Sequence, residues 1–199
     1  MRLVIATRNP GKLREFSRII DVPGIACVGL DEFPDFPAIA EDGTSFRDNA
    51  LIKAQAAAAA TGLPALADDS GLAVDALQGR PGILSARYAG TGATDRMNWE
   101  KVLAELRDVP PTSRQARFVC AIAVVGHNRA FVAEGELAGV IVDLPRGENG
   151  FGYDPIFLLP QYGRTMAELD PAEKDRISHR AIALRRLRPS LALLARSID

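Results

Sequence analysis

Two adjacent carboxylates interrupt an apolar run in the sequence Ala65-Leu66-Ala67-Asp68-Asp69-Ser70-Gly71-Leu72. The run before them follows a glycine and a proline, and it predicts a buried strand. Because Asp disfavours strands, we expect this strand to end at Asp68 and Asp69. Two interpretations stay open on this stretch alone. Asp-Ser-Gly is good turn chemistry, and the strand ends of open α/β sheets are also where ligands bind.

The alternation of a strand constrains what the two carboxylates can do. Successive strand residues point to opposite faces of a sheet. We therefore expect only one of Asp68 and Asp69 to enter a given cleft directly. The sequence does not decide which of them would ligate a metal ion and which would take a proton.

Length and composition exclude several classes of protein. The chain has 199 residues, which fits one domain or one domain with two lobes, and 47% of the residues are hydrophobic. The net charge of −1 argues against a non-specific nucleic-acid binder. The apolar runs are too short for a membrane span, and Leu3–Ala6 is too short for a signal peptide, so we expect a cytoplasmic protein. Cys27 and Cys120 are expected to be buried small hydrophobes.

The N-terminal segment has the pattern of an anion site. Leu3–Thr7 predicts a buried strand, Arg8-Asn9-Pro10-Gly11 a tight loop, and Lys12 the start of a helix. Free backbone N–H groups and the helix dipole attract phosphate at such a point, and Lys12 adds a full positive charge. The segment is not a Walker loop, because the leading glycine is missing and Leu13 follows the lysine. An ordinary tight loop remains the alternative.

A second group of polar residues lies before and inside the next predicted helix. A proline-broken acidic loop delivers Glu41, and Ser45 opens a helix that runs to about Thr61. Asn49 and Lys53 are four residues apart and share a face of it. Lys53 is a candidate phosphate contact, although most helical lysines are only solvated. The alanine run inside this helix indicates close packing against a neighbour.

The C-terminal half adds a glycine-rich loop and a cationic helix start. The loop Arg146–Pro155 has glycine on both sides of Phe151, which lets a flat ligand stack on the ring. A flexible loop with one anchoring aromatic is the alternative. His179 and Arg180 begin a helix, where the dipole disfavours a cation, and such a local violation hints at function. Between these regions we expect a strand over 116–125, a turn at 126–128, a hairpin partner over 130–134 and a further strand over 137–142.

Elimination narrows the chemistry. With only two histidines and no Gly-x-Ser-x-Gly sequence, a Ser-His-acid triad has no basis, and two separated cysteines make no zinc spacing. What remains is a set of carboxylates, lysines and a stacking aromatic. Carboxylates together with phosphate oxygens are the usual ligands of Mg²⁺. The inventory therefore points to a nucleotide with a phosphate chain, bound with Mg²⁺.

These motifs resemble the inosine/xanthosine triphosphatase (HAM1-like) family over Leu3 to about Leu187. The matching sequences are Thr7-x-Asn9-x-x-Lys12, Glu41-Asp42-Gly43 with Asn49-Ala50 and Lys53, Ala67–Leu72, Ser85-Ala86-Arg87-Tyr88, Phe151-Gly152-Tyr153-Asp154-Pro155 and Ser178-His179-Arg180. Each is weak alone, and their order is specific. The family often has glycine where this chain has Arg8, and it varies at Asp42.

The resemblance implies an α/β fold with an elongated mixed sheet flanked by helices, in one two-lobed domain over 1–199 with an active-site cleft between the lobes, and a homodimer. It implies hydrolysis of non-standard purine nucleoside triphosphates (ITP, dITP and XTP) to the monophosphate and pyrophosphate. The implied general base is Asp69. The implied Mg²⁺ ligands are Glu41, Asp69 and Asp68. The implied substrate-binding residues are Thr7, Arg8, Asn9, Pro10, Gly11, Lys12, Lys53, Ser70, Phe151, Gly152, Tyr153, Asp154, Lys174, His179 and Arg180, with Lys174, His179 and Arg180 at the base edge.

Two other functions stay open at this point. One is a phosphatase that removes only the terminal phosphate, which the identity of the product would distinguish. The other is a nucleotide sensor without turnover. Adjacent carboxylates beside phosphates count against a pure binder, because without a cation they would repel the ligand.

Overall fold

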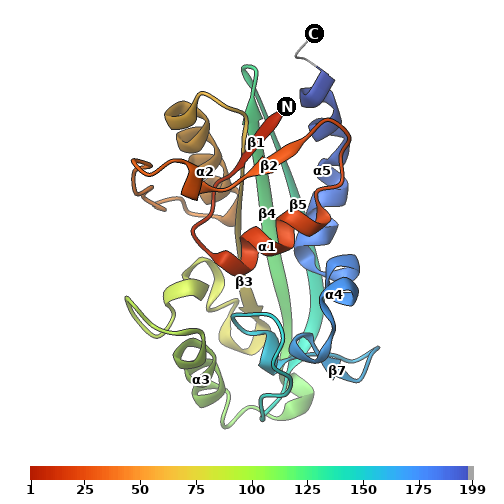
Figure 1. Ribbon diagram of the computed structural model, residues 1–199. Helices are drawn as coiled ribbons and strands as arrows, with labels where there is room; N and C mark the ends of the chain where they lie inside the picture. Colours follow the sequence, from red (N-terminus) through yellow and green to blue (C-terminus); the bar gives the residue numbers. More distant parts are fainter. Residues whose placement is uncertain (197–199) are drawn as a thin grey trace. The chain divides into compact units, whose positions relative to one another are not determined.

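The structure is a computed structural model that describes residues 1–196 (Figure 1). Its strands form one seven-stranded sheet in the order β2-β1-β3-β4-β5-β6-β7. The strands are β1 (Arg2–Ile5), β2 (Ala26–Val28), β3 (Ala65–Val74), β4 (Gln115–Gly126), β5 (Arg129–Ile141), β6 (Phe157–Leu159) and β7 (Arg164–Thr165). The α-helices are α1 (Pro10–Ile19), α2 (Phe46–Thr61), α3 (Asp95–Glu105), α4 (Pro171–Ile177) and α5 (His179–Arg196).

The sheet is mixed, as expected. Strand β1 pairs in parallel with β2 and β3, whereas β6 pairs antiparallel with β5 and β7. The chain divides into two compact units, and each is described here by itself. Unit 1 comprises Met1–Asp69, Cys120–Gly135 and the segment from His179 onward, and unit 2 comprises Ser70–Val119 and Glu136–Ser178. The elongated, two-lobed arrangement with a cleft, and the single domain over the whole chain, stay predictions.

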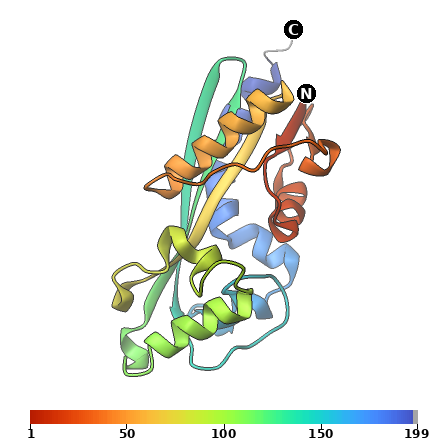
Figure 2. The same cartoon turned by 90° about the vertical axis from the view of Figure 1, so that its left-hand side faces the viewer.

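Unit 1 buries both faces of its strands under helices (Figure 2). On one face, large side chains of β1, β3 and β4 pack against α1 and α5, and Phe16 and Leu187 lie in this cluster. On the other face, small side chains of the same strands pack against α2, through Ala50, Ala54 and Ala57. Neighbouring strand residues alternate between the two clusters, as the period of a strand requires.

Helix α2 forms where its caps and alanines predict it. The Ser45 hydroxyl accepts a hydrogen bond from the Asp48 N–H at the start, and Gly62 ends the helix with φ of +68°. Ala50, Ala54 and Ala57 are fully buried against the small side chains of the sheet. Close packing therefore involves Ala50, Ala54 and Ala57, whereas Ala59 and Ala60 of the alanine run that predicted it are exposed.

The expectation that a strand ends at Asp68 and Asp69 is wrong, and so is the turn interpretation. Strand β3 continues through both carboxylates to Val74. Both side chains are buried in cation-containing clusters, which outweighs the low strand propensity of Asp. Tertiary contacts that lie far away in the sequence thus override the local signal.

The second half of the hairpin also differs from expectation. Instead of a partner strand and a separate further strand, β5 runs unbroken from Arg129 to Ile141. Gly135 lies inside it because helix α5 passes very close. A Cβ atom at Gly135 would lie 2.5 Å from the backbone nitrogen of Ala183. The glycine that looks like a strand breaker in the sequence is a point of close backbone approach.

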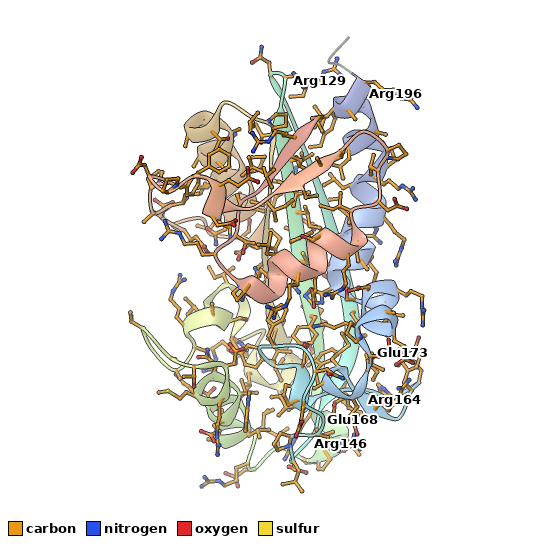
Figure 3. The ribbon with its side chains drawn as sticks, viewed as in Figure 1. Arg129, Arg146, Arg164, Glu168, Glu173 and Arg196 are labelled. Carbon is orange, nitrogen blue, oxygen red and sulfur yellow. The ribbon has the colours of Figure 1, made fainter. Side chains whose placement is uncertain are left out.

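Unit 2 has its own core and surface ion pairs. Phe118 and Phe157 pack in this core with ring centroids 4.2 Å apart. On the surface, the Arg164 guanidinium donates two hydrogen bonds, of 2.7 and 3.1 Å, to the Glu173 carboxylate at the start of α4 (Figure 3). Pairs that remain partly exposed to solvent contribute little stability, so the core carries the fold of this unit.

None of the helices within residues 1–196 combines the length and apolar character that crossing a membrane requires.

The contact between Gly71 and the turn at Ser85 gives a stability test. A Cβ atom at position 71 would lie 2.5 Å from the Gly82 carbonyl oxygen and would also overlap the Ser85 side chain. Because backbone cannot move away easily, Gly71→Ala should lower the free energy of unfolding by about 3 kcal/mol. Gly62→Ala is the matched control, since space is open there and only the left-handed φ is strained, at about 1 kcal/mol. Urea unfolding measures both, and equal costs would contradict the close contact.

Candidate active site

The loop between β1 and α1 is organised by its own side chains. The Thr7 hydroxyl accepts a hydrogen bond from the Asn9 N–H at 3.1 Å. The Asn9 side-chain oxygen accepts from the N–H groups of Gly11 and Lys12 at 2.8 and 3.1 Å. Pro10, which has no N–H, occupies the first helical position. These amides are therefore capped from within, and the charge of Lys12 and the helix dipole remain the main attraction for an anion.

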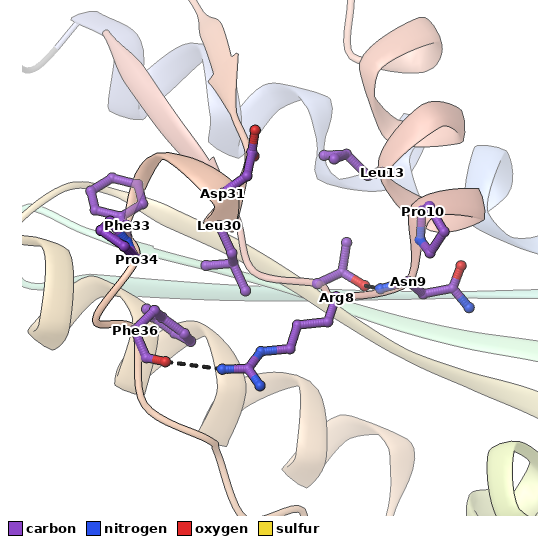
Figure 4. Close-up of a pocket in the computed structure, with 10 residues that line it drawn as sticks. Arg8, Asn9, Pro10, Leu13, Leu30, Asp31, Phe33, Pro34 and Phe36 are labelled. Carbon is purple, nitrogen blue, oxygen red and sulfur yellow. Dashed lines mark hydrogen bonds between the residues drawn. The ribbon is translucent and has the colours of Figure 1, made fainter. Parts of the chain in front are cut away.

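A pocket of about 430 Å³ lies beside this loop, between it and the segment Leu30–Phe36 (Figure 4). The Arg8 guanidinium donates a hydrogen bond of 2.9 Å to the Phe36 carbonyl oxygen and so joins the two segments. The sequence analysis did not single out this aromatic segment. Phe33 and Phe36 on either side of Pro34 were the available signal. The pocket is lined by Thr7, Arg8, Asn9, Pro10, Leu13, Leu30, Asp31, Phe33, Pro34 and Phe36.

Asp68 faces the side of the sheet covered by α1 and α5. One of its oxygens lies 3.0 Å from the Lys12 ammonium and 3.1 Å from the Arg180 guanidinium. Arg180 in turn donates to Glu15 at 2.8 Å, and Arg180, Asp68 and Glu15 are all nearly inaccessible to solvent. Burial alone would raise the pKa of Asp68, but the charges of Lys12 and Arg180 outweigh it and hold that pKa well below its usual range. Asp68 is thus a permanently ionised link between α1 and α5.

Asp69 faces the opposite side of the sheet, toward α2. Its carboxylate accepts a hydrogen bond from the Asn49 amide at 3.0 Å and lies 3.5 Å from the Lys53 ammonium. Burial raises the pKa of Asp69, and the opposing effects of Lys53 and Asn49 do not cancel it. Asp69 therefore accepts a proton more readily than an ordinary aspartate does, as a general base requires.

Glu41 completes the cluster at Asp69. Its carboxylate lies 3.3 Å from the Lys53 ammonium, so that Lys53 contacts both acids. The loop that carries Glu41 is anchored to α2, because Gly43 donates its N–H to the Asn49 side-chain oxygen at 2.9 Å. Burial would lower the pKa of Lys53, but Asp69, Asp68 and Glu41 raise it, which keeps the ammonium charged.

The arrangement bears on the expected metal ion. Across the described residues, no group of three or more His, Cys, Asp or Glu side chains is gathered as a metal cage. Glu41 and Asp69 nevertheless present oxygens to one cation, the Lys53 ammonium. Two carboxylates completed by phosphate oxygens and water are a usual Mg²⁺ environment. These two residues fit the ion, whereas the contacts of Asp68 with Lys12 and Arg180 do not favour its predicted role as a ligand.

Unit 2 contains the predicted aromatic platform. The Lys174 ammonium lies 4.7 Å from the centre of the Phe151 ring and 2.6 Å from the Asp154 carboxylate. Asp154 also accepts a hydrogen bond from the Phe151 N–H at 3.0 Å. Lys174 and Asp154 are almost fully buried. The ammonium thus lies over one face of the Phe151 ring in a cation–π contact, and a flat ligand that stacks on this ring would use the other face.

The predicted site residues thus fall into two groups. Unit 1 holds the loop Thr7–Lys12, Glu41, Lys53, Asp68, Asp69, His179 and Arg180, and unit 2 holds Ser70, Phe151–Asp154 and Lys174. The sequence analysis missed Glu15, the buried partner of Arg180. An acid three residues after Lys12, on the apolar face of a helix, was the signal for it. It also left Asn49 out of the site, although it placed Asn49 on the same helix face as Lys53.

Comparisons with known proteins agree with this fold. By architecture the chain is a mixed-sheet α/β protein. The model of the Ham1 family matches residues 3–190, and the chain belongs to this family.

Curated relatives resemble the chain over nearly their full length. A "dITP/XTP pyrophosphatase" of Geobacter sulfurreducens is 53% identical over 96% of this chain and 96% of that protein. One of Nocardia farcinica is 52% identical over 98% and 96%. Among solved structures, a HAM1 protein from Coxiella burnetii has a TM-score of 0.86 at 45% identity, covering 97% of this chain and 99% of that one. The Staphylococcus aureus Ham1 protein has a TM-score of 0.84 at 44% identity, covering 96% and 98%.

The opposite environments of the two neighbouring aspartates give a stability test. Asp68→Asn should lower the free energy of unfolding at pH 7 by about 3–5 kcal/mol, because it leaves buried cations uncompensated. The depressed pKa means that this contribution is present above the unfolded pKa of about 4 and fades as the pH falls below it. Asp69→Asn is the matched control.

For Asp69 the sign is reversed. Its raised pKa means that stability is lost as the pH rises from about 4 through the folded-state value, so the amide should be at least as stable as the wild type at pH 7. Denaturant unfolding of both variants between pH 3 and 7 measures the difference. Equal effects of the two substitutions would contradict the assignment.

Proposed function

We propose that this chain hydrolyses non-standard purine nucleoside triphosphates, namely ITP, dITP and XTP, to the monophosphate and pyrophosphate with the help of Mg²⁺. The observation that carries the proposal is the Asp69 cluster, where a buried carboxylate with a raised pKa lies beside Lys53 and near Glu41. The printed names of the relatives, dITP/XTP pyrophosphatase, supply the substrate class.

The residues of unit 1 then take separate roles. Lys12 and Lys53 neutralise the phosphate chain, and Glu41 and Asp69 hold the metal ion. Mg²⁺ bound there would polarise the phosphoryl oxygens and screen the repulsion between carboxylates and phosphates. Asp69 also takes the proton of the attacking water. Asp68 keeps Lys12 in place through their 3.0 Å ion pair.

Base recognition is assigned to the platform of unit 2. Phe151 stacks on the purine, and Lys174 donates to the keto oxygen at C6 that inosine and xanthine share. Adenine presents an amino donor there, so ATP should be a poor substrate. Arg180 was also predicted to read the base edge, and this stays a prediction. Its guanidinium contacts Asp68 and Glu15 in this structure, so replacing it would disturb the Asp68 cluster as well.

We infer two further properties, of which only the first comes from the family resemblance. One is a homodimer, which sedimentation of the purified protein tests. The other, a cytoplasmic location, was expected from the short apolar runs of the sequence and stays a proposal. The alternative functions remain a phosphatase that releases terminal phosphate and a sensor without turnover.

The first test of the proposal is product analysis. Purified protein incubated with ITP, XTP, GTP or ATP and Mg²⁺ should release pyrophosphate from ITP and XTP and very little from ATP. Asp69→Asn should lower kcat by on the order of 10²–10⁴, the usual effect of losing a positioned base, while circular dichroism stays that of a folded protein. Orthophosphate as the product would favour the phosphatase, and near-normal turnover by the variant would refute the role of Asp69.

The second test separates phosphate binding from metal binding. Lys12→Ala should weaken binding of ITP much more than binding of inosine, because its partner is the phosphate chain. Activity should disappear in EDTA and return with Mg²⁺. Arg14→Ala on the exposed side of α1 is the matched control and should bind ITP normally. Full activity in chelator would exclude the metal role of Glu41 and Asp69.

A further inference from the structure

The sequence Ser85-Ala86-Arg87-Tyr88 comprises the end of the short 3₁₀ helix Gly82–Arg87 and the start of the turn that follows, and the site described above uses none of it. We propose that the segment Ser85–Tyr88 supports the aromatic platform at Phe151. Ser85 and Asp95 act as positioning residues that fix the orientation of Phe151 through Tyr153 and Gly152. The inference rests on the proposed function for its meaning, but its geometry lies wholly within unit 2.

Ser85 is hydrogen-bonded to strand β3. Its hydroxyl accepts a hydrogen bond from the Leu72 N–H at 2.9 Å and donates one to the Gly82 carbonyl oxygen at 2.6 Å. Gly71 leaves no room for a side chain at this contact. Ser85 itself is buried. Its own carbonyl oxygen therefore occupies a fixed position relative to the strand.

Tyr153 uses that carbonyl group as its anchor. The Tyr153 hydroxyl donates a hydrogen bond of 2.7 Å to the Ser85 carbonyl oxygen, and both residues are buried. Burial raises the pKa of this phenol, so it remains a donor at neutral pH. Tyr153, predicted from the sequence to bind substrate, thus points its polar end at the turn.

Helix α3 holds the same two segments from another side. The Asp95 carboxylate accepts a hydrogen bond of 2.6 Å from the Gly152 N–H. One helical turn later, the buried Asn98 side chain accepts from the Ala89 N–H at 2.8 Å and donates to the Ala86 carbonyl oxygen at 3.3 Å. The beginning of α3 therefore connects the Ser85–Tyr88 turn with the loop that carries Phe151.

These anchors act on the residues that directly follow Phe151. Gly150 and Gly152, on either side of the ring, have φ of +81° and +64°. Because glycine has wide conformational freedom, the loop could adopt other conformations if these anchoring hydrogen bonds were absent. Asp95 and Ser85 hold the C-terminal side of the ring, and Asp154 holds its N–H. Phe151 thereby receives a defined orientation before any base arrives, which lowers the entropic cost of binding.

The test compares two variants that each remove one anchor. Tyr153→Phe loses the hydroxyl donor, and Asp95→Ala loses the acceptor for Gly152, whereas Asp95→Asn retains an acceptor oxygen and should rescue. Tyr162→Phe, an exposed tyrosine of the same unit, is the control. The inhibition constant of IMP should rise about 3- to 10-fold in both loss variants, the usual worth of one hydrogen bond, while that of pyrophosphate stays unchanged.

A second measurement is independent of activity. Amide hydrogen exchange of the peptide containing residues 150–155, without nucleotide, should be faster in Tyr153→Phe and Asp95→Ala and unchanged in Tyr162→Phe. Unchanged exchange would overturn the inference whatever the enzyme does. Equal weakening of IMP and pyrophosphate would overturn it as well, since that is the result of general destabilisation. If the wild type fails to hydrolyse ITP, the proposed function is wrong. The exchange result still decides whether Ser85 and Asp95 position the loop that carries Phe151.

Discussion

The alternating direction of side chains along strand β3 places the two neighbouring aspartates of unit 1 in different environments. Asp68 and Asp69 are chemically identical neighbours, yet β3 turns their carboxylates to opposite faces of the sheet. One face supplies Lys12 and Arg180, which keep Asp68 ionised. The other supplies Lys53 and Asn49, which leave Asp69 with a raised pKa. A shift of the strand by one residue would exchange these environments, so the pairing of β3 with β1 at Val4–Ala65 sets the roles of both acids.

Much of this arrangement could be predicted from the sequence, because its signals are local. The cap at Ser45 begins a helix where expected. The alternation argument correctly separated Asp68 from Asp69. The continuation of β3 through two aspartates and the unbroken β5 were missed, since they depend on cations and a helix backbone far away in the sequence. The partnership of Glu15 with Arg180, 165 residues apart, has the same cause.

The two groups of predicted site residues, one in each unit, rest on different physical supports. Around Asp68 and Asp69 the side chains are held by ion pairs of buried groups, where charge balance fixes position and protonation together. Around Phe151 the supports are hydrogen bonds that join side chains to backbone groups, together with the buried Lys174–Asp154 ion pair. The carboxylates and lysines of unit 1 could be recognised from their residue types. The support of Phe151 could not, because every residue has a backbone carbonyl group like the one that Ser85 contributes.

The buried alanines of α2 limit which substitutions this helix can accept. Ala50, Ala54 and Ala57 have no accessible surface, and they bring the helix backbone close to the sheet. Asn49 and Lys53 extend from the same helix, so the distance at which they meet Asp69 is set by the thickness of a methyl group. A mutation to valine at such a position touches no ligand, yet it would lift the helix and withdraw both side chains from the carboxylate. Variation among descendants of this chain is therefore restricted at residues that carry no functional group at all.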